Sequence, residues 1–122
     1  MFAMKVWIYS GQTISELYSE LFTVPSILVI QEHETGYSAT FMISFQGQWI
    51  TLKDQFPKKS RQHYSGVTTD SRGFDVEWSM RMVGKTITGF YQMDYDRGRI
   101  ELNLVSVKKS LPVQRQLALA AI

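Results

Sequence analysis

Residues 37–52, with the sequence YSATFMISFQGQWITL, decide the fold class. From Tyr37 to Phe45 the larger apolar residues occupy every second position, which is the period of a strand with one buried face. Gln46-Gly47 suits a two-residue hairpin turn, because glycine adopts positive φ without steric cost. This turn puts Phe45 opposite Gln48, Ile43 opposite Ile50 and Phe41 opposite Leu52. The apolar side chains of both strands then share one face, which predicts an antiparallel hairpin.

Residues 74–107 extend the same pattern over three more strands. Gly84-Lys85 predicts a type II′ turn, which takes glycine at its first central position. The register that follows pairs Met82 with Ile87, Met80 with Gly89, Trp78 with Tyr91 and Val76 with Met93. We expect the next turn at residues 95–98, which pairs Asp94 with Arg99, Met93 with Ile100, Tyr91 with Leu102 and Gly89 with Leu104. One apolar face runs through all three strands, so we predict a meander.

The N-terminal part of the chain mixes strand and helix signals. Residues 1–9 and 26–32 are predicted strands, and the second turns at residues 33–36 into the strand that starts at Tyr37. Residues 10–13 read as a turn. Thr13 precedes Glu16 by three residues, the spacing of a helix capping box, and apolar residues then recur at helical spacing as far as Phe22. We therefore predict a helix over residues 13–22.

These elements predict a mainly β fold, α+β by strict count, with seven to eight antiparallel strands in hairpin and meander order. Residues 62–69 are the candidate for the eighth strand, and residues 112–122 are a candidate for a short C-terminal helix. Such a set of strands closes as a small barrel or folds into a sandwich, and the sequence does not choose between them. Residues 1–122 contain no repeat or linker, so we predict a single domain.

Composition excludes several classes of protein. The 122 residues contain no cysteine and carry a formal net charge of +2, which removes disulfides and cysteine-ligated metals and does not by itself indicate a nucleic-acid partner. The apolar run Ile27–Ile30, like every other in the sequence, is far short of the ~20 residues that span a bilayer. No signal-peptide pattern is visible either, so we expect a cytoplasmic protein that does not bind membranes.

No motif in the sequence predicts catalysis, a metal or a cofactor. The histidines are His33 and His63, without the spacing of a zinc site, and Glu32-His33-Glu34 reads as a solvated turn. Nucleophile motifs and phosphate-binding glycine loops are absent. His63 is the only plausible general base, beside Tyr64 in the long polar segment. We expect a non-enzymatic protein with no cofactor.

The segment from Asp54 to Gly73 is the first candidate for function. Interpreted as a long loop, it combines four cations with aromatic residues and carries a net charge equal to that of the whole chain. Such a surface suits an acidic protein partner, or the phosphates and bases of single-stranded nucleic acid. The predicted partner-binding residues are Phe56, Lys58, Lys59, Arg61, His63, Tyr64 and Arg72.

The inner face of the meander is the second candidate. Glycine at position 89 leaves a gap that, in a closed barrel, opens a cavity for a small apolar ligand, unless methionine side chains fill it. The predicted ligand-binding residues are Trp78, Met80, Gly89 and Tyr91. On the outer face, Phe90, Val105 and Val107 form a partly apolar surface suited to a covering helix or to self-association.

The sequence therefore favours a binding protein of the inhibitor or immunity type that recognises a macromolecule, most simply a protein, through residues 54–73. The alternative is a carrier or sensor of a small apolar ligand inside a barrel. A second alternative is binding of single-stranded nucleic acid, which predicts steep salt dependence.

Overall fold

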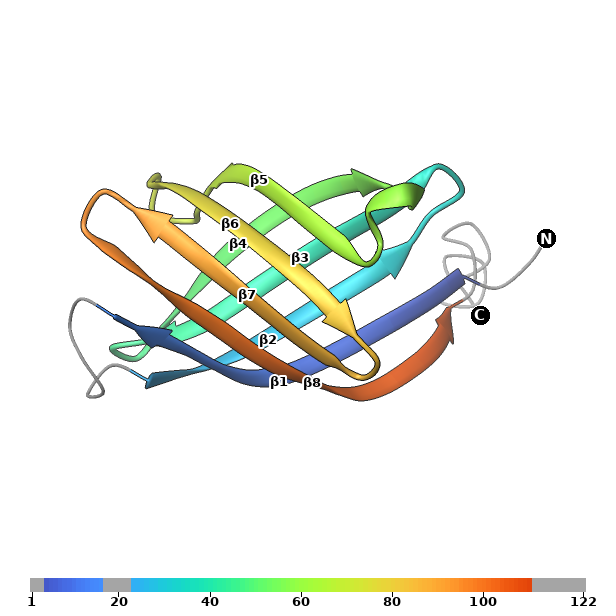
Figure 1. Cartoon of the computed structure of the whole chain (residues 1–122), viewed down its shortest axis with the longest axis horizontal. Helices are drawn as coiled ribbons and strands as arrows, with labels where there is room; N and C mark the ends of the chain where they lie inside the picture. Colours follow the sequence, from blue (N-terminus) through green and yellow to red (C-terminus); the bar gives the residue numbers. More distant parts are fainter. Residues whose placement is uncertain (1–3, 17–22, 111–122) are drawn as a thin grey trace, which may run out of the picture.

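A computed structural model of the chain describes residues 4–16 and 23–110, and these form eight strands and one turn of 3-10 helix (Figure 1). The strands are β1 (Met4–Ser15), β2 (Thr23–Glu32), β3 (Gly36–Phe45), β4 (Gln48–Pro57), β5 (His63–Thr69), β6 (Asp75–Val83), β7 (Thr86–Met93) and β8 (Asp96–Ser110). The 3-10 turn, Lys58–Ser60, connects β4 to β5. The mainly antiparallel β fold is confirmed.

The eight strands form one sheet that curls into a nearly closed barrel (Figure 1). Their order is β4-β3-β2-β1-β8-β7-β6-β5, so consecutive strands pair within β1–β4 and within β5–β8, and β1 pairs with β8 to join the two halves. Only β4 and β5, at the two edges of the sheet, lack a ladder of backbone hydrogen bonds between them. We call this gap the seam.

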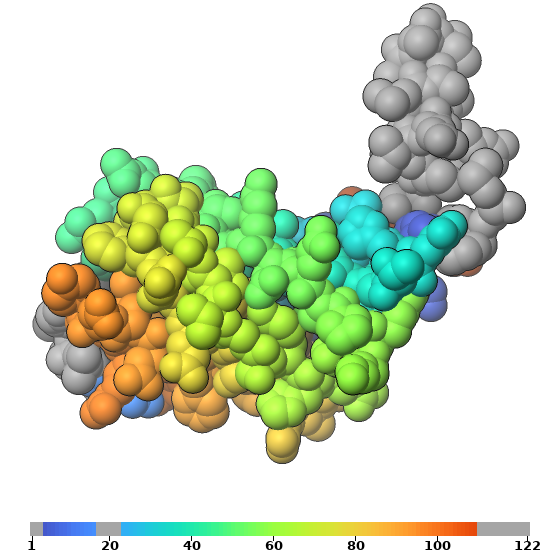
Figure 2. Space-filling model, turned by 90° about the horizontal axis from the view of Figure 1, so that it is seen from above, coloured from blue at the N-terminus to red at the C-terminus, as the bar shows by residue number. Residues whose placement is uncertain are grey.

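Side chains bridge the seam. The Tyr64 hydroxyl and the Thr68 hydroxyl, both on β5, donate hydrogen bonds to the Asp54 carboxylate on β4. Near the start of β4, the Thr51 amide donates to Ser71 Oγ at 3.0 Å, and the Ser71 amide donates to the Thr51 carbonyl at 2.9 Å. Figure 2 looks onto this side of the molecule, where side chains from the green-to-yellow part of the chain cover the barrel.

Two of the predicted hairpins have the register expected from their turns. β3 pairs with β4 through Phe45–Gln48, Ile43–Ile50 and Phe41–Leu52. β6 pairs with β7 through Met82–Ile87, Met80–Gly89 and Trp78–Tyr91. The glycines have the expected backbone, with φ of 79° at Gly47 and 61° at Gly84.

The predicted register between β7 and β8 is wrong. The turn consists of Asp94 and Tyr95 alone, so Met93 pairs with Asp96, Tyr91 with Gly98 and Gly89 with Ile100. The partner of each β7 residue moves by an even number of positions, so the inward face stays the same. A Cβ at Gly98 would lie 2.7 Å from the Tyr91 ring, so the shorter turn brings the residue without a side chain opposite this tyrosine.

The predicted helix over residues 13–22 is not present in its described part, because Thr13–Ser15 continue β1 and residues 17–22 lie outside the described residues. The expected turn at residues 10–13 is also strand. β1 pairs with β2 on one side and β8 on the other, which satisfies the backbone groups that a helix cap would otherwise serve. The helical candidate at residues 112–122 lies outside the described residues.

The interpretation of residues 54–73 as a long loop is also wrong. β4 runs to Pro57, and the optional strand at residues 62–69 is present as β5. Short connections remain at residues 58–62 and 70–74. Two inward positions of these strands carry polar residues, Asp54 and Thr68, which are joined by a hydrogen bond of 3.0 Å. Because these positions are polar, the sequence lacks the apolar alternation that usually indicates a strand.

The core lies inside the barrel. Its buried members come from both halves of the sheet: Tyr9, Leu28, Ile30, Ala39, Phe41, Leu52, Phe56, Val76, Trp78, Met80, Ile87, Ile100 and Leu102. Trp78 and Tyr91 lie on the same side of the sheet, as the register predicts. The outer apolar residues Phe90, Val105 and Val107 are exposed, as expected.

Candidate ligand cavity

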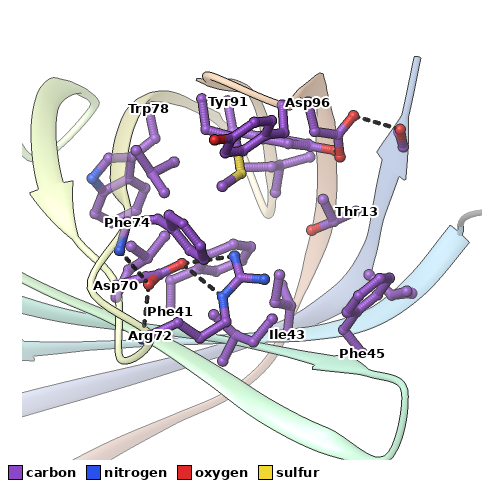
Figure 3. Close-up of a pocket in the computed structure, with 18 residues that line it drawn as sticks. Thr13, Phe41, Ile43, Phe45, Asp70, Arg72, Phe74, Trp78, Tyr91 and Asp96 are labelled. Atoms are coloured by element: carbon purple, nitrogen blue, oxygen red, sulfur yellow. Dashed lines mark hydrogen bonds and ion pairs between the residues drawn. The ribbon is translucent and has the colours of Figure 1, made fainter. Parts of the chain in front are cut away.

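A cavity of about 450 Å³ occupies one end of the barrel interior (Figure 3). This end, at the left in Figure 1, carries the turns β3–β4, β5–β6 and β7–β8, and we call it the mouth. An eight-stranded barrel is just wide enough either to be filled by side chains or to hold one small ligand. The lining residues are Thr13, Ser15, Val24, Phe41, Ile43, Phe45, Ile50, Leu52, Asp70, Arg72, Phe74, Val76, Trp78, Tyr91, Met93, Tyr95, Asp96 and Ile100.

The walls of the cavity are mostly apolar, because the inward positions of all the strands except β5 meet there. Phe41 and Trp78 stack across the barrel with their ring centroids 5.9 Å apart and form the floor of the cavity together with Leu52. The Trp78 indole is held from behind, since its Nε1 donates to Thr68 Oγ1 at 2.9 Å. A fixed apolar surface with few polar groups is typical of a small-molecule pocket.

The turn at residues 70–73, the mouth turn, is held by the carboxylate of Asp70, whose side chain is 1% exposed. Asp70 Oδ1 accepts hydrogen bonds from the backbone amides of Arg72 at 2.8 Å and Phe74 at 3.0 Å. Burial alone would raise the pKa of Asp70, but the hydrogen bonds from Arg72 and Phe74 outweigh it and leave the pKa below its ordinary value. The carboxylate is therefore ionised at neutral pH, and its hydrogen bonds hold the mouth turn together.

Arg72 extends from this turn across the mouth (Figure 3). Its Nε and Nη2 donate to Asp70 Oδ2 at 3.1 and 2.8 Å, and its guanidinium lies 5.0 Å from the centroid of the Phe74 ring. The third nitrogen, Nη1, has no hydrogen-bond partner among the described residues. In Figure 3 it points away from Asp70 and over the cavity. Arg72 thus has one face fixed to the protein and one face open.

A second polar group lines the opposite wall. Asp96 accepts hydrogen bonds from Ser15 Oγ at 2.6 Å, from the Tyr91 hydroxyl at 2.7 Å and from the Arg97 amide at 2.8 Å. Burial and the neighbouring Asp96 carboxylate raise the pKa of Tyr91 above its ordinary value, so the phenol remains a donor. Deeper along β1, Thr13 Oγ1 and Ser26 Oγ lie 2.7 Å apart and bond to each other.

The opposite end of the barrel, which we call the closed end, is blocked by Arg61. Its guanidinium lies 4.3 Å from the centroid of the Trp7 ring and 5.6 Å from that of Tyr37. Its Nη2 donates to the Tyr9 hydroxyl at 3.0 Å, and its Nη1 lies 3.5 Å from the sulfur of Met82. A void of only about 20 Å³ remains beside it, too little for a ligand.

The seven predicted partner-binding residues do not form one surface. Phe56 is buried, and Tyr64 packs inside the barrel between Phe56 and Trp78, with ring centroids 5.1 Å from each. Arg61 points into the closed end, whereas Arg72 lies at the mouth. The exposed members are Lys58, Lys59, His63 and, at the mouth, Arg72.

Lys58 is itself engaged. Its Nζ lies 3.3 Å from Glu32 Oε2 and 5.0 Å from the centroid of the Tyr37 ring. The pKa of Glu32, which burial alone would raise, is lowered by its bonds to the Lys5 amide and to Lys58. A cation already paired in this way offers less charge to a partner than the sequence suggests.

Two of the four predicted ligand-binding residues, Trp78 and Tyr91, line the cavity. Met80 and Gly89 do not, because Met80 fills the gap at the glycine: a Cβ at Gly89 would lie 3.2 Å from Met80 Cγ and collide with the Ser79 carbonyl oxygen. The polar groups of the mouth, Asp70 and Asp96, were not predicted from the sequence. The only signal for Asp70 was an Asp-x-x-Gly turn, whose side chain commonly accepts a hydrogen bond from the backbone two residues on.

The described residues contain no group of three or more His, Asp or Glu side chains arranged to hold a metal ion. His33, one of the two histidines, instead lies 2.9 Å from Ser38 Oγ through its Nε2. In the same residues there is no helix with the length and apolar character needed to cross a membrane.

Comparisons of the chain with models of protein families, with curated proteins and with solved structures found no match.

Proposed function

We propose that this protein is a carrier or sensor of a small apolar ligand, which binds inside the barrel at its mouth. The observation that supports this proposal is the cavity of about 450 Å³, which is within the range of roughly 300–1,000 Å³ that small-molecule pockets occupy. Core residues normally pack to the density of organic crystals and leave few voids larger than a water molecule. A space of this size with apolar walls is therefore unexpected in a barrel that has no ligand.

The asymmetry of the barrel supports the same proposal. At the closed end, Arg61 and the aromatic rings around it fill the interior and leave a void of about 20 Å³. At the mouth, the hydrogen-bonded mouth turn holds the entrance in shape while the interior stays open.

Each buried CH₂ group of a ligand contributes about 0.8 kcal/mol to the free energy of binding. A molecule with several such groups therefore gains enough to offset the cost of association.

Filling the cavity tests the proposal. Ile43 lines the cavity, and Ile43→Trp would occupy much of it, whereas Thr88→Trp adds the same side chain at an exposed position of β7. We expect the wild-type protein and Thr88→Trp to bind medium-chain apolar compounds with equal affinity and Ile43→Trp to lose at least tenfold. Equilibrium dialysis measures the binding. Equal binding by the two tryptophan variants, or no binding by the wild type, would rule the proposal out.

Recognition of a macromolecule through residues 54–73 is a weaker proposal. Of the residues predicted for it, Lys58, Lys59 and His63 are exposed near one another in sequence and Arg72 is exposed at the mouth. Two of these cations are already paired, Lys58 with Glu32 and Arg72 with Asp70. Single-stranded nucleic acid would need more unpaired cations than this. Self-association through the exposed Phe90, Val105 and Val107, and a cytoplasmic location, likewise stay predictions from the sequence.

A further inference from the structure

The polar groups that line the cavity are almost all satisfied by one another. Thr13 bonds to Ser26, and Ser15 and Tyr91 bond to Asp96. Trp78 bonds to Thr68. Asp70 accepts four hydrogen bonds. Three come from Arg72, through Nε, Nη2 and the backbone amide, and the fourth comes from the backbone amide of Phe74. None of these groups needs a ligand to complete its hydrogen bonding.

Arg72 Nη1 is the exception among the described lining residues, because it has no partner there and, on a side chain that is 35% exposed, is left to water when no ligand is bound. It belongs to a guanidinium whose other two nitrogens are fixed to Asp70, and it points over the cavity (Figure 3). A guanidinium nitrogen only donates hydrogen bonds. The group on the ligand that complements it must therefore be a hydrogen-bond acceptor.

The charge at the mouth decides which kind of acceptor fits. Among the described lining residues the charged groups are the Arg72 cation and the carboxylates of Asp70 and Asp96, so the balance is negative. Asp70 already compensates Arg72 through a close ion pair of 2.8 Å. An anionic head group in this site would lose its hydration and lie near two carboxylates and a cation that is already paired. The free energy lost in this transfer exceeds the free energy gained from one hydrogen bond to Arg72.

We infer that the ligand is an uncharged apolar molecule with a carbonyl-type oxygen, which accepts a hydrogen bond from Arg72 Nη1 at the mouth while its apolar part fills the cavity. This inference rests on the proposed function and adds the chemical class of the ligand. Arg72 acts here as a specificity residue. Asp70 is a positioning residue, because it holds the guanidinium so that Nη1 faces inward.

Three probes of matched chain length test the inference: octane, 2-octanone and octanoate. Binding is measured by equilibrium dialysis and chromatography of the bound fraction, at neutral pH and physiological salt. We expect octanoate to bind at least tenfold more weakly than 2-octanone. We also expect Arg72→Met, which keeps an unbranched side chain but has no donor, to lower the affinity ratio of 2-octanone to octane about tenfold.

Two further variants keep the test informative. Arg72→Met leaves the buried Asp70 without its cation, so a second variant controls for unfolding. Asp70→Asn/Arg72→Met removes both charges together and is expected to show the same loss in the ratio. Arg97→Gln changes an exposed arginine at the same end that does not line the cavity, and should leave the ratio unchanged.

The outcomes separate the inference from the proposed function. If octanoate binds as tightly as 2-octanone, or if the ratio is the same within twofold in the Arg72 variants, the inference is wrong while the cavity remains a binding site. If none of the three probes binds to the wild-type protein, the inference and the proposed function fail together.

Discussion

At the residue scale, the mouth of the cavity depends on the ionised carboxylate of Asp70. It caps the backbone amides of Arg72 and Phe74 and forms an ion pair with Arg72 at 2.8 Å, although its side chain is almost completely buried. Its pKa lies below the ordinary value, because these donors outweigh the effect of burial. A group of this kind stabilises the fold above its unfolded pKa, and that contribution is lost as pH falls.

Acid should therefore destabilise the protein partly through Asp70. As the pH falls below 3.8, the ordinary pKa of an aspartate, and through the lower pKa of Asp70 in the folded state, protonation of Asp70 breaks the ion pair, so the free energy of unfolding should decrease. Asp70→Asn should be less stable than the wild type at pH 7 and should lose less on acidification. Urea unfolding at pH 7 and pH 3 measures both quantities. Parallel loss in the two proteins would contradict the assignment.

Gly98 shows a second residue-scale constraint, the close approach of two strands. A Cβ there would lie 2.7 Å from the Tyr91 ring and would collide with the Ile14 carbonyl oxygen. We expect Gly98→Ala to cost about 2–4 kcal/mol of stability, in the range of severe core defects. Gly84→Ala is the control: it has φ of 61° but open space around its Cβ, so only backbone strain of roughly 1 kcal/mol is expected. Similar losses in thermal or urea unfolding would refute the steric explanation.

At the same scale, the sequence predicted apolar residues better than polar ones. Trp78 and Tyr91 were predicted to share an inner face, and they do, because alternation alone assigns faces. Asp54, Asp70 and Asp96 were not recognised as inward residues. Asp96 accepts from Ser15, which lies 81 residues away, and Asp54 from Tyr64 on the facing edge strand, so no local pattern reveals these donors. The donors to Asp70 are local, but its turn does not show which way the carboxylate faces.

At the scale of elements, the seam between β4 and β5 is held by side chains instead of a backbone ladder. The central group is Asp54, which accepts hydrogen bonds from the hydroxyls of Tyr64 and Thr68. Thr68 also accepts from Trp78 Nε1 at 2.9 Å, so the seam is connected to the floor of the cavity. Strands held by few hydrogen bonds open at a lower free energy than the rest of a sheet.

Tyr64→Phe should weaken the seam in particular. Loss of the phenol leaves the Asp54 carboxylate with one donor fewer in a partly buried place, at a cost of about 1–3 kcal/mol. Amide hydrogen exchange should accelerate in β4 and β5 before it does in β1 and β8. Thr86→Val, which removes an exposed hydrogen bond of 3.4 Å to Asn103, is the control and should cost under about 0.5 kcal/mol. Uniform acceleration over all strands would argue against a weak seam.

The elements that the sequence predicted well are hairpins with turns marked by glycine. A two-residue turn and an alternating face together fix the register, as at Gln46-Gly47 and Gly84-Lys85. The β7–β8 turn lacks glycine at its centre, and its length was misjudged. The end of β1 was misread as a helix because its inward residues are polar: Thr13 bonds to Ser26 on β2, and Ser15 bonds to Asp96 on β8.

At the scale of the whole molecule, closure of the barrel could not be read from the sequence. It requires β1 to pair with β8, which is about 90 residues away, and nothing local distinguishes this pairing from a sandwich. The consequence of closure is an interior with two different ends. Apolar side chains and Arg61 fill one end, and the other end keeps a cavity of about 450 Å³.

Arg61 should therefore affect stability without affecting the ligand. Its guanidinium stacks on Trp7 at 4.3 Å and donates to Tyr9, so Arg61→Met loses a cation–π contact and a hydrogen bond and should cost about 1–3 kcal/mol. The cavity lining does not include it, so affinity for 2-octanone should stay within twofold of the wild type. In contrast, Arg72→Met should lower the affinity for 2-octanone selectively, relative to that for octane. Urea unfolding and equilibrium dialysis on both variants measure this contrast. If Arg61→Met weakened binding as much as Arg72→Met does, the two ends would not be independent, and the ligand would have to reach through the barrel.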